Sequence, residues 1–236
     1  MTSRRLALVT GASRGLGLAL ARDLADAGWS LVIDAREPSA LAAAASELAA
    51  TARVRALAGD VTDPVHRRAL LAAVDDLGGQ SGLDVLVHNA SVLGPSPQPR
   101  LADYPLDALG HVYAVNVMAP LALTQLALSR LRPGGRILAI TSDAAVEAYE
   151  GWGGYGSSKA ALQHLAAVLA VEHPELRVYQ VDPGDMRTRM QAEAFPGEDL
   201  SDRRPPEDSV PGLRMLIDGD LPSGRYLARD LVPAAQ

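Results

Sequence analysis

Short apolar runs alternate along the chain with longer segments in which apolar residues recur at helical spacing. The first run, from Leu6 to Val9, stops at a glycine-rich turn, and an amphipathic pattern that predicts a helix follows from Gly15 to Ala27. Gly28 closes that helix, because glycine is a usual residue just beyond a helix end. Five later runs are predicted to be strands: Leu31 to Ile33, Val54 to Leu57, Val85 to His88, Arg136 to Thr141 and Arg177 to Val181.

The predicted strands are apolar on both faces, and a helical segment separates each from the next, such as the alanine-rich one from about Ser39 to Ala50. This alternation predicts an α/β protein with a doubly wound parallel sheet, covered by helices on both sides in three α/β/α layers. No linker or repeat divides residues 1–236, so a single domain is expected, with a loop or lid around residues 186–211. After Gly212 we expect a short helix, a strand around Tyr226 and a loose tail.

The composition of the chain excludes several kinds of binding partner and several kinds of chemistry. The net charge of −6, with acidic and basic residues scattered, gives no basic surface for nucleic acid or an anionic membrane. The chain has no cysteine, which excludes disulfides and thiolate catalysis and fits a reducing compartment. The histidines lack the spacing of metal ligands, so no metal is expected. No run approaches the roughly 20 apolar residues that span a bilayer, and the first is too short for a signal peptide, so we expect a soluble cytoplasmic protein.

Ligands of such sheets bind beyond the carboxyl ends of the strands, so the residues after each strand are the candidates for a site. After the first strand, the segment from Thr10 to Gly17 has glycines at positions 11, 15 and 17. These glycines allow a tight turn and a close approach of the backbone to a pyrophosphate, and the helix amino end offers free N–H groups. An anion is expected here, although a glycine-rich connection without a ligand has the same composition.

The choice between NAD and NADP depends on the residues at the end of the second strand. Asp34 can accept hydrogen bonds from ribose hydroxyls, which favours NAD, whereas Arg36 and Arg14 can together bind a 2′-phosphate, which favours NADP. We favour NADP. Asp60 and Val61, after the third strand, are candidates for contacts with the adenine, but an aspartate there is equally typical of a helix cap.

A second group of candidates follows the strand that ends at Thr141. Ser142 comes directly after it, and Tyr155 and Lys159 lie four residues apart, on one face of the helix that they begin. The ordinary pKa of tyrosine is about 10, and a nearby ammonium group stabilises the phenolate and lowers that pKa. Ser142 can then hold a substrate oxygen while Tyr155 gives or takes the proton. Taken singly, each residue is more typical of packing or of a turn, but the ordered set favours catalysis.

These motifs together resemble the short-chain dehydrogenase/reductase family, in its short single-domain form with a Rossmann fold, over roughly residues 5 to 190. The segment from Thr10 to Gly17 corresponds to the family pattern TGxxxGxG, and the run from His88 to Ser91 stands where the family usually has NNAG. The other residues that carry the resemblance are Asp60, Val61, Asn116, Ser142, Tyr155, Lys159, Pro183, Gly184 and Thr188.

The resemblance implies an oxidoreductase that transfers hydride between NAD(P) and a carbonyl or alcohol carbon. Tyr155 would be the acid/base, Lys159 would lower its pKa and hold the nicotinamide ribose, and Ser142 would orient the carbonyl. Asn116 would support a water-linked proton path to Lys159, and Thr188 with the preceding Pro-Gly turn would bind the carboxamide side. The residues expected to bind the cofactor are Gly11, Ser13, Arg14, Gly15, Leu16, Gly17, Arg36, Asp60, Val61, Asn89, Ala90, Ser91, Tyr155, Lys159, Pro183, Gly184 and Thr188.

The resemblance also bears on the cofactor and on the subfamily. Arg36 stands where NADP-preferring members carry their arginine, and Ala35 where NAD-preferring members carry an acid, which strengthens the expectation of NADP. His88 and Ser91 depart from the first Asn and the Gly of NNAG, so a local difference near the adenosine half is expected. The carboxyl end, from Ser223 to Asp230, lacks the usual Gly-Gly strand, which leaves the subfamily and the subunit contacts open.

A small-molecule substrate is expected between the loop after the fifth strand and the segment around residues 186–211. Tyr149 and Trp152 lie in the first of these, and Met190 and Phe195 in the second, which favours an apolar or ring-bearing substrate unless these side chains only fill gaps between loops. Acidic residues in both segments disfavour a strongly anionic substrate.

Two helical regions, about Pro105 to Arg130 and from near Ser157 onwards, are apolar on more than one side. This favours a homodimer or homotetramer paired through them, as family members commonly do, over ordinary packing on the sheet. Two other functions stay open: a catalytically silent regulator that senses NADP(H), and a lyase or isomerase that uses the cofactor transiently. The intact set of Ser142, Tyr155 and Lys159 disfavours the first, and relatives of the second kind usually have an added substrate domain.

Overall fold

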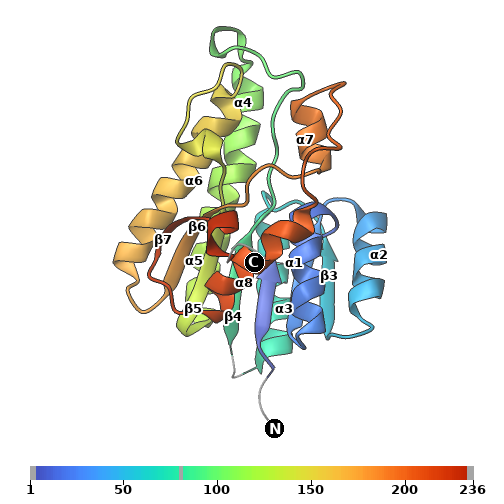
Figure 1. Ribbon diagram of the computed structural model, residues 1–236. Coiled ribbons are helices and arrows are strands. Elements are labelled where there is room, and N and C mark those ends of the chain that lie inside the picture. The colour runs from blue at the N-terminus through green and yellow to red at the C-terminus, as the bar shows by residue number, and fades with distance from the viewer. Residues whose placement is uncertain (1–3, 80–81, 233–236) are drawn as a thin grey trace.

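The apolar runs of the sequence form a seven-stranded parallel sheet (Figure 1). The computed structural model describes residues 4–79 and 82–232. The strand order is β3-β2-β1-β4-β5-β6-β7, and each neighbouring pair is parallel. The strands are β1 (Leu6–Val9), β2 (Ser30–Ala35), β3 (Val54–Ala58), β4 (Leu83–His88), β5 (Leu131–Ile140), β6 (Arg177–Asp182) and β7 (Gly224–Leu227).

Helices cover both faces of the sheet. α1, α2 and α8 pack on one face, and α3, α5 and α6 pack on the other, which confirms the predicted three-layer α/β fold in a single domain. The α-helices are α1 (Gly15–Asp26), α2 (Pro38–Leu48), α3 (Pro64–Gly78), α4 (Leu106–Tyr113), α5 (Ala119–Ala127), α6 (Gly153–Glu172), α7 (Arg189–Ala194) and α8 (Val210–Asp218). A π-helical turn, η3 (Ala114–Met118), joins α4 to α5. The 3₁₀ turns are η2 (Leu101–Asp103), η4 (Leu128–Arg130), η5 (Asp143–Ala145), η6 (Pro206–Ser209) and η7 (Ala228–Leu231).

The central strand β1 shows why the sheet needs helices on both sides. Ala7 and Val9 contribute to the apolar cluster beneath α1 and α8, whereas Leu6 and Leu8 contribute to the cluster beneath α3 and α5. All four side chains are buried. Complete burial of a leucine stabilises the fold by about 1.5–3 kcal/mol, so a strand apolar on both faces is stable only where both faces are covered.

Several element boundaries differ from the sequence prediction by one or more residues, among them the starts of β5 and α6. β5 begins at Leu131 rather than at Arg136, because Leu131 already pairs with Leu83 across a register shift. α6 begins at Gly153, so Tyr155 and Lys159 both lie within its first two turns. The boundary of α6 therefore places both side chains at the end of the helix that adjoins the carboxyl edge of the sheet (Figure 1).

The order of the strands creates the crevice that the fold class predicts. β2 and β3 lie on one side of β1, and β4 to β7 lie on the other. The crossovers from β1 and β4 therefore run in opposite directions, and a crevice opens beyond their carboxyl ends. In Figure 1 these ends point upward, and α7 with the upper parts of α4 and α6 lies above them.

From Leu106 to Arg130 the chain forms one helical run that includes α4, η3 and α5. By length and composition its 25 residues are sufficient to cross a membrane, which corrects the expectation that no segment is long and apolar enough. Half of its apolar window is buried inside the molecule, as in the core helix of a globular protein, so this feature is only weak support for a membrane span.

The carboxyl-terminal part contains both of the elements expected there. The short helix is α8, which begins at Val210, and the strand around Tyr226 is β7, which pairs with β6. The expected tail includes residues 233–236, which lie outside the described residues. The segment between α7 and η6 returns beside the end of β6, where Met186 forms a bridge with Arg204.

Candidate active site

The turn between β1 and α1 is held by residues from the end of β4. The hydroxyl of Thr10 donates to the carbonyl oxygen of Val87 at 3.1 Å and accepts from the backbone N–H groups of Asn89 and Ala90, each at 3.1 Å. The side-chain amide of Asn89 donates to the carbonyl oxygens of Thr10 at 2.8 Å and Gly11 at 3.0 Å. Gly11 has a φ of 66°, and a Cβ there would lie 2.9 Å from the Cα of Ala90, so only glycine fits this turn.

The amino end of α1 faces a cavity of about 790 Å³ at the carboxyl edge of the sheet. Arg14 is the N-cap residue and gives no side-chain hydrogen bond to the first turn, whose N–H groups are therefore available to a ligand. Gly15 follows with a φ of 56°. These N–H groups and the positive end of the helix fit an anion such as a pyrophosphate. From this turn the cavity is lined by Gly11, Ser13, Arg14, Gly15 and Leu16.

Gly17 does not line the cavity, which corrects its predicted place among the cofactor contacts. A Cβ on Gly17 would lie 2.5 Å from the amide nitrogen of Asn89 and 2.6 Å from the carbonyl oxygen of Gly11. Gly17 therefore acts indirectly, because its missing side chain lets α1 approach the hydrogen bond that joins Asn89 to the turn.

Asp34, at the end of β2, has a different role from the ribose contact considered for it. Its carboxylate accepts from the N–H of Gly11 at 2.8 Å and lies 3.0 Å from Nε2 of His66. The Asp34 side chain is only 1% exposed. The imidazole of His66 packs against Gly59, where a Cβ would clash with the ring. Asp34 thus fastens the glycine-rich turn to α3 and has both oxygens engaged within the protein.

The side chains of Arg14 and Arg36 line the cavity together with Asp60 and Val61, which follow β3. Asp60 accepts from the backbone N–H and the hydroxyl of Thr62, at 2.8 and 2.7 Å. Partial burial opposes the ionisation of Asp60, but these hydrogen bonds and the nearby charge of Arg36 bring its pKa below the ordinary value. A guanidinium group can bind a phosphate, and an ionised Asp60 is available to accept hydrogen bonds.

Ser142, Tyr155 and Lys159 line the other end of the same cavity. The Ser142 hydroxyl donates to the carboxylate of Asp143 at 2.8 Å. Lys159 is the only lysine in the chain. Its Nζ lies 5.5 Å from the centre of the Tyr155 ring and donates to the carbonyl oxygen of Ile140 at 2.8 Å. The structure therefore brings the three predicted catalytic side chains together.

The charge states of these groups depend on burial and on nearby charges. Burial raises the pKa of Tyr155, and the carboxylates of Asp143 and Asp182 raise it further. A hydrogen bond with Ser91 lowers the pKa of Tyr155, but by less than the other effects raise it. Burial also lowers the pKa of Lys159 to about 7. The described side chains therefore raise the pKa of Tyr155 on balance, and a lowering of that pKa by Lys159 stays a prediction.

Asn116 lies behind the wall of the cavity, fully buried in the π-helical turn η3. Its amide nitrogen donates to the carbonyl oxygen of Val92 at 2.9 Å and to the hydroxyl of Ser158 at 3.0 Å. Its amide oxygen accepts from Ser91 at 3.1 Å and from the N–H of Val92 at 2.9 Å. π-helical turns often occur at functional sites. Asn116 joins the loop after β4 to α6, and its part in a proton path to Lys159 stays a prediction.

The loop after β6 completes the cavity with Pro183, Gly184 and Thr188. Gly184 has a φ of 76°, and its N–H donates to the carboxylate of Asp182 at 2.9 Å. Asp182 also pairs with Arg225 of β7 at 3.0 Å. Burial raises the pKa of Asp182, although both of these partners act to lower it. This loop therefore places a largely buried carboxyl group beside the predicted catalytic residues.

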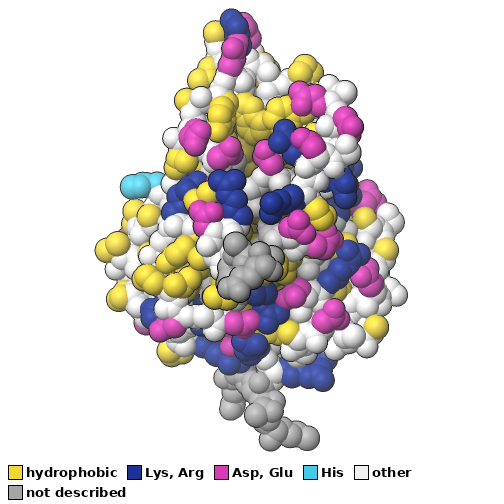
Figure 2. Space-filling view, in the orientation of Figure 1, with side chains coloured by type: hydrophobic (Ala, Val, Ile, Leu, Met, Phe, Trp, Pro, Cys, Tyr) yellow, Lys and Arg dark blue, Asp and Glu magenta, His cyan; other side chains and the backbone are white. Residues whose placement is uncertain are grey.

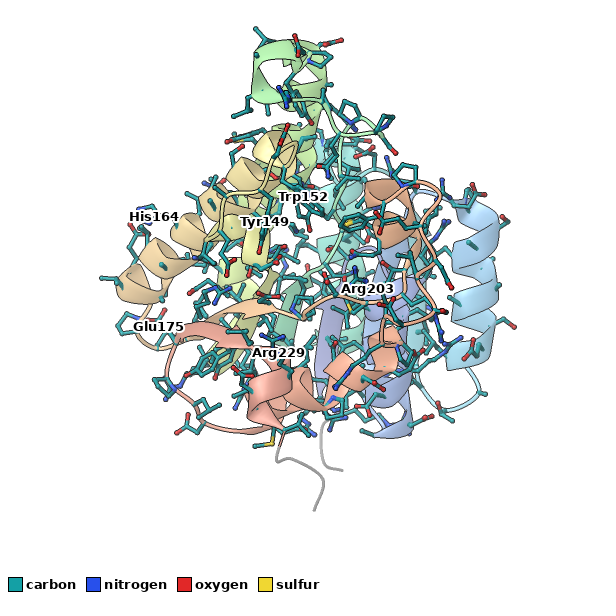
Figure 3. All side chains as sticks on the ribbon, turned by 45° about the horizontal axis from the view of Figure 1, so that its top comes forward. Tyr149, Trp152, His164, Glu175, Arg203 and Arg229 are labelled. Atoms are coloured by element: carbon teal, nitrogen blue, oxygen red, sulfur yellow. The ribbon has the colours of Figure 1, made fainter. Side chains whose placement is uncertain are left out.

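An apolar wall closes the end of the cavity that lies beside Tyr155. The ring of Trp152 lies 5.8 Å from the rings of both Tyr155 and Phe195, centre to centre, and 6.4 Å from the ring of Tyr149. Figure 3 shows Tyr149 and Trp152 beside each other near the start of α6. Figure 2 shows hydrophobic side chains gathered between the upper part of α4 and α7, with charged groups around them. At this end of the cavity Leu93, Ala144 and Tyr155 form a buried apolar cluster, and Trp152, Met190 and Ala194 pack against it.

Most of the predicted site residues line this one cavity. Among them are Gly11, Ser13, Arg14, Gly15, Leu16, Arg36, Asp60, Val61, Asn89, Ala90, Ser91, Ser142, Tyr155, Lys159, Pro183, Gly184 and Thr188. Sequence reasoning missed Asp182 and Leu93. The end of a strand just before a Pro-Gly turn is a signal that points to Asp182, but nothing in the sequence distinguishes Leu93 from other core leucines. Within residues 4–79 and 82–232, no group of three or more histidine or acidic side chains is placed to hold a metal ion.

The chain is similar in sequence and in fold to known dehydrogenases and reductases. Residues 5–199 match the family model described as short chain dehydrogenase. The chain is 35% identical over 196 residues to the sepiapterin reductase of Mus musculus, an alignment that covers 78% of this chain and 75% of the relative. It is also 35% identical over 195 residues to a rhamnolipids biosynthesis 3-oxoacyl-[acyl-carrier-protein] reductase of Pseudomonas aeruginosa, covering 79% of this chain and 74% of the relative. A structure from Escherichia coli CFT073 in complex with NADPH superposes with a TM-score of 0.86 at 30% identity, covering 95% of this chain and 96% of the other.

Proposed function

This chain belongs to the short-chain dehydrogenase family, and we propose that it is an NADP(H)-dependent reductase that converts a small ketone or aldehyde to an alcohol. The observation that carries the proposal is the single cavity in which Ser142, Tyr155 and Lys159 face the open amino end of α1. A nicotinamide cofactor bound there supplies the hydride. The side chains of the protein bind the cofactor, orient the carbonyl group and deliver the proton.

The adenosine end of the cavity supports NADP. Arg14 and Arg36 are both available to a 2′-phosphate, whereas Asp34 is occupied by Gly11 and His66 and does not compete for a ribose hydroxyl. The similar structure from Escherichia coli CFT073 contains NADPH, which supports the same choice for this chain. Removing a guanidinium–phosphate contact costs about 1.5–3 kcal/mol, so Arg36→Ala is expected to weaken NADPH binding about 10- to 100-fold. An equal loss of NADH and NADPH affinity would contradict this assignment.

Tyr155 acts as the acid in this proposal. Because burial and the carboxylates of Asp143 and Asp182 raise its pKa, the phenol holds its proton at neutral pH. An alkoxide formed by hydride addition is a stronger base than a phenolate, so the proton passes from Tyr155 to the substrate oxygen. Ser142 orients that oxygen once its hydroxyl turns away from Asp143. The same raised pKa leaves little phenolate at neutral pH, so Tyr155 can accept a proton from an alcohol only when its pKa is lowered.

The substrate is proposed to be an apolar or ring-bearing carbonyl compound held against Trp152, Met190 and Leu93. Asp143 and Glu193 also line the cavity and disfavour a strongly anionic substrate. The two relatives named above are both reductases, but their names point to different substrates. The substrate class therefore rests on the wall of this cavity.

The proposal also includes a homo-oligomer. Large apolar side chains are exposed along the helices after β4 and β5, namely Leu106, Met118, Leu126, Val168 and Val171. Burying such a face against a second copy removes it from water. Light scattering coupled to gel filtration is expected to show a dimer or tetramer that Met118→Glu weakens. A monomer at every protein concentration would contradict this part of the proposal.

The reductase is tested by mixing the protein with NADPH and a panel of carbonyl compounds while following nicotinamide absorbance. Tyr155→Phe is expected to abolish turnover but keep cofactor binding. The matched control is Tyr226→Phe, because Tyr226 lies on β7 and its hydroxyl only donates to the carbonyl oxygen of Pro222. Tight NADPH binding without turnover of any compound would instead indicate a sensor, and net conversion without an absorbance change would indicate a lyase or isomerase.

A further inference from the structure

The edge strand β7 carries a charged side chain that reaches the end of β6. Arg225 lies in β7, where it is in register with Gln180 of β6. Its guanidinium group donates to the carboxylate of Asp182 at 3.0 Å and to the side-chain oxygen of Gln163 at 3.2 Å. Gln163 belongs to α6 and lies about two turns after Tyr155. Arg225 therefore joins the helix that carries the predicted acid to the loop that follows β6.

Asp182 connects Arg225 to the wall of the cavity. One oxygen of its carboxylate accepts from Arg225, and the other accepts from the N–H of Gly184 at 2.9 Å. Pro183 and Gly184 both line the cavity, and Gly184 has a φ of 76°. The Asp182 side chain is only 6% exposed. Because both carboxylate oxygens are engaged, the guanidinium group fixes the direction of the carboxylate, and the carboxylate fixes the N–H of Gly184.

The loop after β6 lies at the end of the cavity that contains the predicted catalytic residues. β6 pairs with β5, and the carbonyl oxygen of Val181 accepts from the N–H of Thr141 at 2.7 Å. Ser142 and Asp182 are the next residues of the two segments, and both line the cavity. β2, which leads to Arg36, lies on the other side of β1. The loop is therefore remote from the residues that we assign to the 2′-phosphate.

We propose that Arg225 is a positioning residue for cofactor binding, which through Asp182 fixes the Pro-Gly turn that binds the nicotinamide half and through Gln163 ties this turn to α6. The inference rests on the proposed function. A guanidinium group suits the task because its N–H groups form a rigid fork, and Arg225 uses two different nitrogen atoms for its two partners. It stands in the carboxyl-terminal segment that lacks the usual Gly-Gly strand, so the family motifs do not predict this contact.

Removing the guanidinium group weakens the hold on the turn in two ways. It frees one oxygen of the carboxylate, so the hydrogen bond from Gly184 loses its fixed direction. Burial raises the pKa of Asp182 and the charge of Arg225 opposes this rise, so the ionised form also becomes less favourable. Arg225→Met is expected to raise the Kd for NADPH about tenfold. Arg225→Lys keeps a positive charge near Asp182 but has no fork, so it is expected to recover part of that affinity.

The test uses calorimetric titration with two ligands, NADPH and 2′-phospho-ADP-ribose, which has the same adenosine and phosphate groups but no nicotinamide. Arg225→Met is expected to weaken the binding of NADPH about tenfold and that of the fragment less than about twofold. Arg177→Met is the matched control, because Arg177 pairs with Asp220 at 2.9 Å at the opposite end of β6. This control is expected to bind both ligands as the wild type does. An equal loss of affinity for both ligands in Arg225→Met would overturn the positioning role, because it would indicate a general loosening of the fold.

A second variant tests the route through Asp182 and covers a failure of Arg225→Met to fold. Asp182→Asn keeps an acceptor for the N–H of Gly184 and removes the buried charge, so its combination with Arg225→Met is expected to fold. Adding Arg225→Met to Asp182→Asn is expected to change the Kd for NADPH by less than about twofold, and a further tenfold loss would overturn the route.

Binding without turnover also separates the two proposals. The expected affinities in a protein that reduces no carbonyl compound would overturn the reductase and leave the role of Arg225. Carbonyl reduction by Arg225→Met with the NADPH affinity of the wild type would overturn the role of Arg225 and leave the reductase.

Discussion

Replacing Gly17 with alanine is expected to lower the free energy of unfolding by about 2–4 kcal/mol, although alanine is normally the better helix former. Gly17 is the third residue of α1, and a Cβ there would lie 2.5 Å from the Asn89 amide nitrogen and 2.6 Å from the Gly11 carbonyl oxygen. Neither the Asn89 amide nor the Gly11 carbonyl group can move away from such a Cβ without breaking local structure. Gly11 is fixed by its backbone, and Asn89 is fixed by two hydrogen bonds to the turn.

The magnitude follows from three contributions. Losing the two hydrogen bonds of Asn89 costs about 1 kcal/mol each, and forcing a methyl group into a packed site costs about 1–3 kcal/mol. The higher helix propensity of alanine offsets about 1 kcal/mol of this loss in the free energy of unfolding. In a protein of this size, a net loss of 2–4 kcal/mol lowers the Tm by roughly 5–15 °C. Because the same hydrogen bonds shape the turn at the cavity, NADPH binding is also expected to weaken.

Gly110 provides the matched control, because it is also a helical glycine but a Cβ there meets no atom within 4 Å. Gly110→Ala is expected to stabilise the protein by about 0.5–1 kcal/mol. Urea unfolding of both variants, followed by circular dichroism, gives the two differences in free energy. If Gly17→Ala proves as stable as Gly110→Ala, the close packing of α1 against Asn89 and the turn does not restrict position 17, and the prediction is refuted.

Two further predictions concern buried titratable groups. Because Lys159 is the only lysine, protein with ¹³C-labelled lysine is expected to give one side-chain NMR signal that titrates near its pKa of about 7, and a midpoint near 10 would contradict the effect of burial. Folding then releases a proton between pH 7 and 10, so the stability of the wild type relative to Lys159→Met is expected to rise with pH there by about 1.4 kcal/mol per unit. His66→Ala is expected to lower the free energy of unfolding by about 2–4 kcal/mol, because it removes a hydrogen-bond partner of the buried Asp34 side chain. His173→Ala only breaks an exposed pair with Glu175, so it is expected to change the free energy of unfolding by less than about 0.5 kcal/mol. Equal losses in the two histidine variants would contradict the role of His66 as the partner of Asp34.

The fold could be predicted from the sequence because its strands and turns are marked by patterns within short stretches of the chain. Strands such as Leu6–Val9 and Ser30–Ala35 are apolar at consecutive positions, and glycines mark the turns that follow β1 and α1. Boundaries were less accurate where pairing rather than pattern decides them. β5 extends back to Leu131 because β4 offers a partner there, and the sequence around Pro133 carries no strand pattern of its own.

The sequence predicts which residues form the candidate site, but it does not predict their protonation states. Ser142, Tyr155 and Lys159 lie in recognisable places after strands, and the structure gathers them in one cavity. Their protonation depends on burial and on Asp182, which comes from another strand. Asp34 shows the same limit, because its sequence position favours a ribose contact and its buried partner on α3 is visible only in three dimensions.

The charge balance of the cleft links its acid/base chemistry to the state of the cofactor. With Asp143 and Asp182 close to Tyr155 and with Lys159 weakly basic, the cleft favours a protonated phenol, which is the form that the proposed reduction needs. For Tyr155 to act as a base, positive charge has to enter the cleft, and an oxidised nicotinamide ring carries that charge. The direction of proton transfer would then follow the oxidation state of the cofactor, with no rearrangement of the side chains beyond the turning of hydroxyl groups. Burial contributes most to the raised pKa of Tyr155 and the two carboxylates add to it, so in the proposed reductase they help the phenol keep the proton that reduction requires.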